Sequence, residues 1–265
     1  MAFQIIRHAF AMIFNNFGQA LRASVGPYVL LIIVAAAVFG ALGSLEQLGE
    51  LAVGNIQPDQ IADVAGPIIF AVFVLLTLAV FVSAWVAVSW HRFILLEEYS
   101  GILPSVTGRP IWPYVGKSML LGLLIAVLGL LVGMVFGLVL VPLAHAGETA
   151  AYLGAAIIGI LMVAVLSLMW FRMGVALPAT AVGKPIKLGA AWSATSGING
   201  TIIGIVLIIA VVTFIAGTAV QGLYGIHPAL GFAVDIFVQW LTLMVGVSIL
   251  TTLYGHVIEG RPLID

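Results

Sequence analysis

The chain has 265 residues, of which 63% are hydrophobic and only 7% are charged, and its formal net charge is −1. A water-soluble fold could not bury so much apolar surface, whereas a lipid bilayer accommodates it. The charge gives no indication of a nucleic-acid partner, and the absence of cysteine excludes disulfides, cysteine-ligated clusters and thiol catalysis. The composition therefore predicts an all-α polytopic integral membrane protein.

Residues 1–24 contain no compact apolar segment of the signal-peptide type, and we predict that they form an amphipathic helix. Apolar side chains recur at steps of three and four on one face of this helix: Phe3, Ile6, Phe10, Ile13, Phe14, Phe17 and Leu21. Two interpretations stand. The helix lies in the plane of the lipid headgroups, or it packs on the surface of the protein's own helices.

Six apolar segments follow, and each is close to the roughly 20 helical residues that cross the hydrocarbon core of a bilayer. They are residues 25–43, 66–90, 119–143, 150–170, 201–221 and 229–253. No polar stretch between them is long enough for a soluble domain, so residues 25–265 are predicted to form one membrane domain. Leucines at helical spacing predict a short acidic surface helix within the connection 44–65.

All nine lysines and arginines fall in segments on one side of the predicted membrane: Arg7, Arg22, Arg92, Arg109, Lys117, Arg172, Lys184, Lys187 and Arg261. Short loops that carry lysine and arginine stay in the cytoplasm. The distribution therefore predicts a multi-pass protein of a bacterial inner membrane, with both termini in the cytoplasm.

A glycine-basic-proline motif occurs three times, as Gly108-Arg109-Pro110, Gly183-Lys184-Pro185 and Gly260-Arg261-Pro262. Each copy follows a predicted span that ends in an aromatic residue with a basic residue or histidine close by. We interpret the pattern as a threefold repeat of helical hairpins, each opened by a short cytoplasmic segment at the membrane interface, namely 3–22, 111–118 and 186–198. The competing interpretation is that any six-span protein of this topology contains three hairpins.

The segment Leu177-Pro178-Ala179, followed by residues Lys187 to Gly197 with their Ala-Trp-Ser core and then by an apolar run, resembles a pattern in a known group of membrane proteins. The pattern belongs to the membrane domain of some bacterial glycerophosphodiester phosphodiesterases and of related multi-span proteins. The resemblance covers about residues 165–210. It implies a relative that consists of the membrane domain without the hydrolase domain, and it supplies no catalytic residues.

Small residues in the third span predict a close helix contact. Gly129, Gly133 and Gly137 are spaced by four, so one helix face carries almost no side chains. This face suits either packing inside the protein or a homodimer contact. The small residues of the fourth span, Ala151, Ala155 and Gly159, offer a matching partner.

Asp235 is the one acidic residue inside the six predicted spans, and Gln239 lies one helical turn further on the same face. An intramembrane carboxylate suggests a site for a cation or a proton. The competing interpretation is an acid near the outer interface, reached by water or hydrogen-bonded to Gln239 or His227.

Two further sets of residues lie at the predicted cytoplasmic ends of the spans. His91, Glu97, Glu98, His256 and Glu259 could supply metal ligands from two helices, but Trp90, His91, Arg92, Tyr254 and His256 are also typical of interfacial anchors, the interpretation that we prefer. Basic residues there could form a rim that binds lipid headgroups, or could serve only to set the topology: Arg92, Arg109, Lys117, Arg172, Lys184, Lys187 and Arg261.

The sequence contains no Walker A, Gly-x-Ser-x-Gly or HExxH motif, so we expect a non-enzymatic protein without a cofactor or metal ion. The preferred role is a structural, lipid-interacting or accessory membrane component, with membrane lipids, a second copy or another membrane protein as partner. The alternative is a small transporter of a solute or ion that uses Asp235 and Gln239.

Overall fold

The computed structural model describes residues 1–42 and 61–263, and these residues form helices and connections without a strand. Six of the described helices are long and apolar enough to cross a membrane. They are α2 (Phe17–Ala41), α4 (Ile61–Leu96), α5 (Ile111–His145), α6 (Glu148–Gly174), α9 (Asn199–Ile226) and α10 (Pro228–Val257). Four shorter elements accompany them, namely α1 (Ala2–Asn15), α7 (Ala176–Ala181), α8 (Leu188–Ala194) and η1 (Ser196–Ile198). The prediction of an all-α polytopic membrane protein is confirmed.

The long helices extend beyond the predicted spans, mainly at the end of the molecule where the basic residues lie. Residues 111–118 do not form a separate interfacial segment, because they are the first turns of α5. The predicted helix 1–24 is interrupted at Asn16, whose side-chain Nδ2 donates to the carbonyl oxygen of Met12 at 2.9 Å, and α2 begins at Phe17. The predicted acidic helix in the connection 44–65 falls mainly on residues outside the described ranges.

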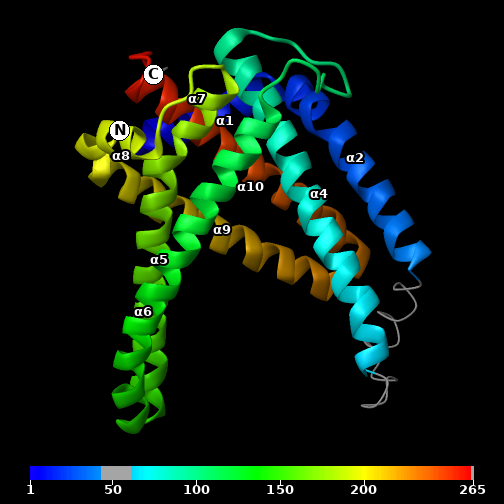
Figure 1. The fold of residues 1–265 in the computed structure, drawn as a ribbon. Coiled ribbons are helices and arrows are strands. Elements are labelled where there is room, and N and C mark those ends of the chain that lie inside the picture. Colours follow the sequence, from blue (N-terminus) through cyan, green and yellow to red (C-terminus); the bar gives the residue numbers. More distant parts are fainter. Residues whose placement is uncertain (43–60, 264–265) are drawn as a thin grey trace.

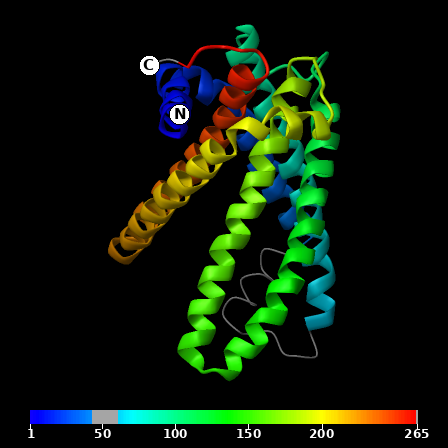
Figure 2. The same cartoon turned by 90° about the vertical axis from the view of Figure 1, so that its left-hand side faces the viewer.

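The six long helices pair into three antiparallel hairpins, α2 with α4, α5 with α6, and α9 with α10. Figure 1 shows that the hairpins meet at one end, which also carries both termini, α1, α7 and α8. From there they diverge, and Figure 2 shows α9 and α10 leaning away from α5 and α6. We call the shared end the convergent end and the opposite end the divergent end.

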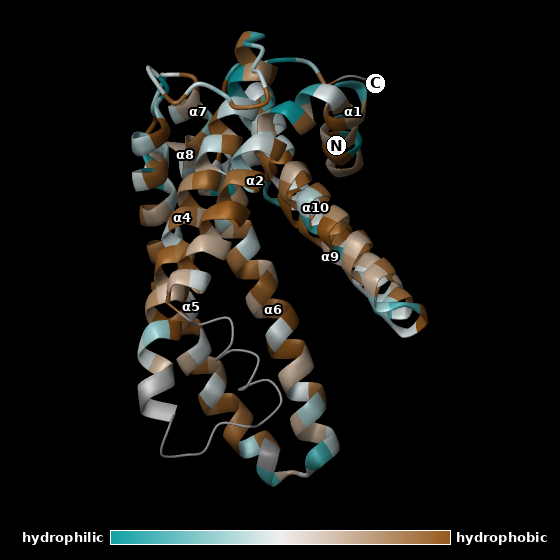
Figure 3. Cartoon of the chain, turned by 90° about the vertical axis from the view of Figure 1, so that its right-hand side faces the viewer, coloured by the Kyte–Doolittle hydropathy of each residue, from teal (hydrophilic) through white to brown (hydrophobic). Residues whose placement is uncertain are grey.

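Apolar side chains remain exposed along the divergent halves of the hairpins. Leu138 of α5 and Phe214 of α9 have 75% and 74% of their surface exposed, respectively. In Figure 3 the long helices are largely hydrophobic over this stretch, whereas hydrophilic residues gather at the convergent end and at the helix tips. Such a surface is stable only in hydrocarbon, so lipid chains surround the divergent halves of the hairpins.

The protein core lies at the convergent end, in what we call the junction, formed by residues 82–95, 171–182 and 244–254. All six residues of α7 are buried there, and α7 contacts α4, α5 and α10. Trp90, His91 and Tyr254 are no more than 2% exposed. The preferred interpretation of these three residues as interfacial anchors is therefore wrong, because the hairpins converge at the depth where an isolated span would meet the membrane interface.

The helix α1 packs on the third hairpin through one face. Its buried residues are Ile5, Ile6, Ala9, Met12 and Ile13, and it contacts α9 and α10. Other members of the predicted apolar face point outward, and Phe3 and Phe14 are 67% and 53% exposed. The structure therefore shows α1 packed on the protein's own helices, and its position in the plane of the lipid headgroups stays a prediction.

The glycines of the three glycine-basic-proline motifs share a left-handed backbone conformation. Gly108, Gly183 and Gly260 have left-handed φ values of 72°, 80° and 68°. Glycine adopts this region without the steric cost that a Cβ atom brings. The motif therefore repeats a left-handed glycine, and it occurs after α4, α7 and α10, once beyond each hairpin.

Candidate functional site

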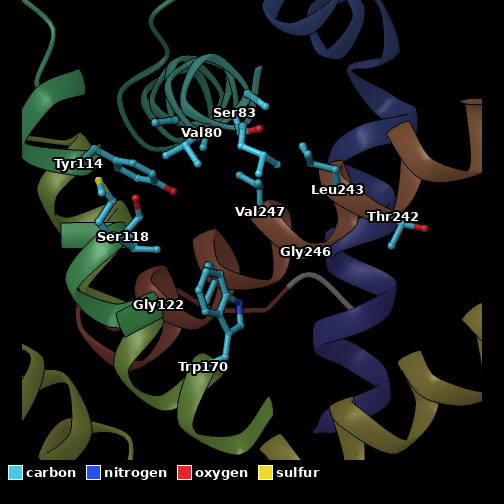
Figure 4. Close-up of a pocket in the computed structure, with 17 residues that line it drawn as sticks. Val80, Ser83, Tyr114, Ser118, Gly122, Trp170, Thr242, Leu243, Gly246 and Val247 are labelled. Carbon is cyan, nitrogen blue, oxygen red and sulfur yellow. The ribbon is translucent and has the colours of Figure 1, made fainter. Parts of the chain in front are cut away.

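A cavity of about 630 Å³ lies beside the junction, where the three hairpins begin to separate. Its walls come from all three hairpins: α4 in the first, α5, α6 and α7 in the second, and α10 in the third. Figure 4 shows the side chains that face it, among them Val80 of α4, Tyr114 of α5, Trp170 of α6 and Val247 of α10. We call it the inter-hairpin cavity. Its volume falls in the range of about 300–1,000 Å³ that is usual for small-molecule sites.

Most of the cavity wall is apolar, and the few polar groups come from hydroxyl-bearing side chains and Trp170. Tyr114 and Ser118 lie one turn apart on α5, and both hydroxyls lie on the cavity side of that helix (Figure 4). Thr242 of α10 also lines the cavity. An apolar cavity with a few fixed polar groups accepts a ligand that is mostly hydrocarbon.

A buried chain of hydrogen bonds lies behind this wall and joins α4, α5 and α10. His91 is fully buried, with Nδ1 at 2.8 Å from Thr251 Oγ1 and Nε2 at 3.2 Å from the Tyr114 hydroxyl. One residue earlier, the indole N–H of Trp90 donates to Ser248 Oγ at 2.9 Å. These bonds satisfy polar groups that would otherwise be costly to bury, and they fix the orientation of Tyr114 at the cavity.

The acids proposed as metal ligands are used elsewhere. Glu98 accepts hydrogen bonds from Arg92 at 2.9 and 2.6 Å and also pairs with Arg109, whereas Glu259 pairs with Arg261 at 2.7 Å. Across the described ranges, no three His, Asp or Glu side chains lie close enough together to hold a metal ion. The structure therefore does not bring the predicted His/Glu set together.

Several members of the predicted basic rim bind other parts of the protein. Arg172 is only 6% exposed; its Nη2 donates to the Trp192 carbonyl oxygen at 2.5 Å, and its guanidinium carbon lies 3.5 Å from the centre of the Trp192 ring. Lys117 Nζ donates to the Ile186 carbonyl oxygen at 2.9 Å. Membership of Arg172 in a lipid-facing rim is therefore wrong, since the indole of Trp192 and the protein backbone cover its charge.

Other members of the basic rim remain accessible. Lys187 is exposed at the start of α8, and 69% of the side chain of Lys184 is exposed although it pairs with Glu259 at 3.5 Å. Burial and then the positive charge of Arg92 lower the pKa of Arg109. Its guanidinium nevertheless stays protonated at neutral pH, because arginine titrates far above that range. The rim thus keeps positive charge at the convergent end.

Asp235 and Gln239 lie on α10, well toward the divergent end from the junction. Asp235 accepts hydrogen bonds from the Tyr224 hydroxyl at 3.3 Å and from Gln239 Nε2 at 3.4 Å. Neither residue lines the inter-hairpin cavity. The geometry is that of an acid held within its own hairpin, partly as the competing interpretation expected, with Tyr224 as a partner that sequence reasoning did not name.

The glycine face of α5 lies against bulky side chains of α6. A Cβ atom at Gly129 would lie 3.5 Å from Leu166, and one at Gly133 would lie 3.2 Å from Met162, whereas one at Gly137 would meet no atom within 4 Å. The first two glycines therefore serve contacts inside the second hairpin. Their partners are large residues and not the predicted small residues Ala151, Ala155 and Gly159.

Sequence reasoning did not identify Tyr114, Ser118 and Trp170 as residues of a site. One signal was present, because Tyr114 and Ser118 are spaced by four and so share a helix face. Their position near a predicted membrane interface made them look like ordinary interfacial residues.

Comparison with known proteins gives no relative. No protein-family model matches the chain, and neither a curated protein nor a solved structure is significantly similar to it. The resemblance of residues 165–210 to the membrane domain of glycerophosphodiester phosphodiesterases therefore stays a prediction.

Proposed function

We propose that this protein binds a membrane lipid, with the hydrocarbon chain of the lipid in the inter-hairpin cavity. One observation carries the proposal: three hairpins share a core at one end only, and the apolar cavity of about 630 Å³ opens where they separate. An apolar cavity is a poor site for water, which needs several polar partners. Hydrocarbon from the surrounding bilayer is the material that fits its walls.

The proposed role is that of a non-enzymatic lipid-interacting or accessory component. The imidazole of His91 and the phenol of Tyr114 bond to each other, and His91 also bonds to Thr251. This arrangement supports a role in shaping the wall of a binding site. A second copy or another membrane protein is a further proposed partner, because the divergent halves of the hairpins offer long apolar faces.

The proposed location is a bacterial inner membrane, with the convergent end in the cytoplasm. The support is the distribution of charge, since all nine basic residues belong to elements at that end. The accessible members of the basic rim, Lys184 and Lys187 among them, would then lie near the anionic headgroups of the inner leaflet.

The test compares two glycine substitutions on α5. Gly122 lines the cavity and Gly137 does not, and a Cβ atom at either position would meet no atom within 4 Å. Gly122→Leu should therefore fill the cavity without displacing the protein, whereas Gly137→Leu adds the same side chain to a lipid-facing position. Each protein is purified in mild detergent, and native mass spectrometry measures the bound lipid.

We expect wild type and Gly137→Leu to retain lipid, and Gly122→Leu to lose most of it while keeping the same thermal midpoint. Equal lipid retention in the two variants, or no retained lipid in wild type, would refute the proposal.

A further inference from the structure

We infer that the lipid in the inter-hairpin cavity carries a hydroxyl group, and that this hydroxyl donates a hydrogen bond to the side-chain oxygen of Tyr114. The inference rests on the proposed function, because it names the chemistry of the ligand for the same cavity. The inference starts from the hydrogen bonds behind the cavity wall. Their donor and acceptor roles determine whether the wall offers donors or acceptors to a ligand.

The donor and acceptor roles along this chain of hydrogen bonds follow from Thr251, the residue furthest from the cavity. The Thr251 hydroxyl donates to the carbonyl oxygen of Val247 at 2.9 Å, so its single proton is used within α10. Its oxygen can then only accept at the 2.8 Å contact with His91 Nδ1. The proton of the imidazole therefore lies on Nδ1.

The imidazole is neutral in this arrangement. His91 is fully buried, and the partners that the structure gives it are the uncharged hydroxyls of Thr251 and Tyr114. A charge without a compensating partner is costly in such surroundings. With Nδ1 protonated, Nε2 is an acceptor, and the Tyr114 hydroxyl donates to it across 3.2 Å.

The Tyr114 oxygen thus faces the cavity with its proton already donated to His91. Ser118, one helical turn away, has also donated its hydroxyl proton. The Ser118 hydroxyl donates to the carbonyl oxygen of Val115 at 2.9 Å. Figure 4 shows the oxygens of Tyr114 and Ser118 on the same side of the cavity, while the indole nitrogen of Trp170 lies on the ring edge turned away from Tyr114. This side of the wall therefore offers lone pairs and no proton.

A wall that offers only acceptors favours a ligand that carries a hydrogen-bond donor. An ester, ether or ketone brings only lone pairs, so the remaining lone pairs of the Tyr114 and Ser118 oxygens would have no donor, and a carboxylate adds repulsion. An ammonium group would donate, but its charge would be buried without an acid beside it. A hydroxyl group donates one hydrogen bond and stays neutral, so a neutral hydroxylated lipid is the ligand class that fits.

The shape of the cavity gives the orientation of the chain. Along α4 the lining runs from Ala87, one turn before His91, to Leu76 toward the divergent end. Eleven helical residues correspond to about 16 Å along the axis. The hydroxyl would therefore lie near the junction and the hydrocarbon chain would extend between the diverging hairpins, as for a lipid whose polar end faces the cytoplasmic side.

The experiment uses delipidated full-length protein and three ligands with the same chain, octadecanol, octadecyl methyl ether and octadecane. Native mass spectrometry titrates each ligand, and Gly122→Leu reports whether binding occurs in the cavity. We expect octadecanol to bind about fivefold more tightly than the ether, as one additional hydrogen bond implies. Equal affinities for the alcohol and the ether, with both blocked by Gly122→Leu, would overturn the inference and leave the proposed function intact. Binding that Gly122→Leu does not block would overturn both.

Two variants test the direction of the bonds. His91→Phe removes the acceptor for the Tyr114 proton, so that proton becomes available to the cavity, and the preference for the alcohol over the ether should shrink or reverse. Tyr114→Phe removes the accepting oxygen and should lower the affinity for octadecanol while leaving that for octadecane unchanged. Ser118→Ala, one helical turn away, is the control and should change neither affinity. An unchanged alcohol preference in both His91→Phe and Tyr114→Phe would overturn the inference, and Tyr114→Phe alone decides if His91→Phe fails to fold.

Discussion

The guanidinium of Arg92, near the end of α4, donates a hydrogen bond to the carbonyl oxygen of Ala181, the last residue of α7, at 2.8 Å. Two further contacts repeat this link between successive hairpins. Lys184 beyond α7 pairs with Glu259 beyond α10 at 3.5 Å, and Arg261 donates to the carbonyl oxygen of Leu95 in α4 at 3.0 Å. The three contacts form a closed ring that joins the first hairpin to the second, the second to the third and the third to the first.

Breaking this ring should destabilise the protein. Arg92→Met removes a charged donor from the Ala181 carbonyl oxygen and from Glu98, and we expect a loss of about 1–2 kcal/mol in the free energy of unfolding. Titration with sodium dodecyl sulfate in mixed micelles measures that loss. Lys187→Met is the matched control, since Lys187 is exposed. A similar stability for both variants would show that the ring contributes nothing.

The left-handed turns should each depend on glycine for the same reason. Gly183→Ala places a Cβ atom in open space but forces alanine to a φ of 80°, which costs about 1–2 kcal/mol. Gly189→Ala, inside α8 and also in open space, should be neutral or stabilising. Thermal midpoints in detergent compare the two. Equal midpoints would argue against a conformational role for the glycine of the repeat.

The contact of α2 with the segment after α4 requires a glycine. A Cβ atom at Gly26 would overlap the carbonyl oxygen of Ile102, which belongs to the backbone and cannot rotate away. Gly26→Ala should therefore cost about 1–3 kcal/mol, the usual cost of overpacking. Gly18→Ala in the same helix, with no atom within 4 Å of the new Cβ atom, is the control. If both variants unfold at the same denaturant concentration, the close approach is not a constraint.

The hydrogen bond between Trp90 and Ser248 should stabilise the junction. Ser248→Ala leaves the buried indole N–H without its acceptor, and an unsatisfied buried donor costs about 1–3 kcal/mol. Ser193→Ala should have little effect, because Ser193 is exposed and its hydroxyl donates to the Gly189 carbonyl oxygen within α8. Unfolding in mixed micelles, followed by tryptophan fluorescence, measures both. The prediction fails if Ser248→Ala is as stable as wild type.

The orientation in the membrane can be mapped directly, because the chain contains no cysteine. We expect Glu148→Cys, at the tip of the second hairpin, to react in intact cells with a maleimide that does not cross membranes. Ser193→Cys, at the convergent end, should react only after the cells are opened. The reverse pattern would place the convergent end outside and contradict the proposed topology.

The sequence was sufficient to predict the membrane class, the six spans and the grouping of charge, since each follows from local composition. It was not sufficient to distinguish a junction from a membrane interface. Trp90, His91 and Tyr254 combine an aromatic or amphipathic ring with a polar atom, and both environments favour such residues. Only the convergence of distant hairpins shows that they are buried, and no local pattern encodes that convergence.

The same difficulty explains why the sequence did not predict the surroundings of α1 and of Arg172. In water an apolar face indicates which residues touch protein, but near a bilayer lipid also accepts apolar side chains. Periodicity therefore could not separate Ile5 and Ile13, which pack on the third hairpin, from Phe3 and Phe14, which do not. In the sequence Arg172 cannot be distinguished from the other basic residues near the span ends. The structure shows that the ring of Trp192, twenty residues away in the sequence, covers its guanidinium.

The three hairpins are joined at the junction, and beyond it their divergent halves separate (Figure 2). The wall of the inter-hairpin cavity is built from helices of all three hairpins. A change in the angle between any two hairpins would therefore change the shape of the cavity, so the packing of the junction, which sets those angles, also sets the shape of the cavity.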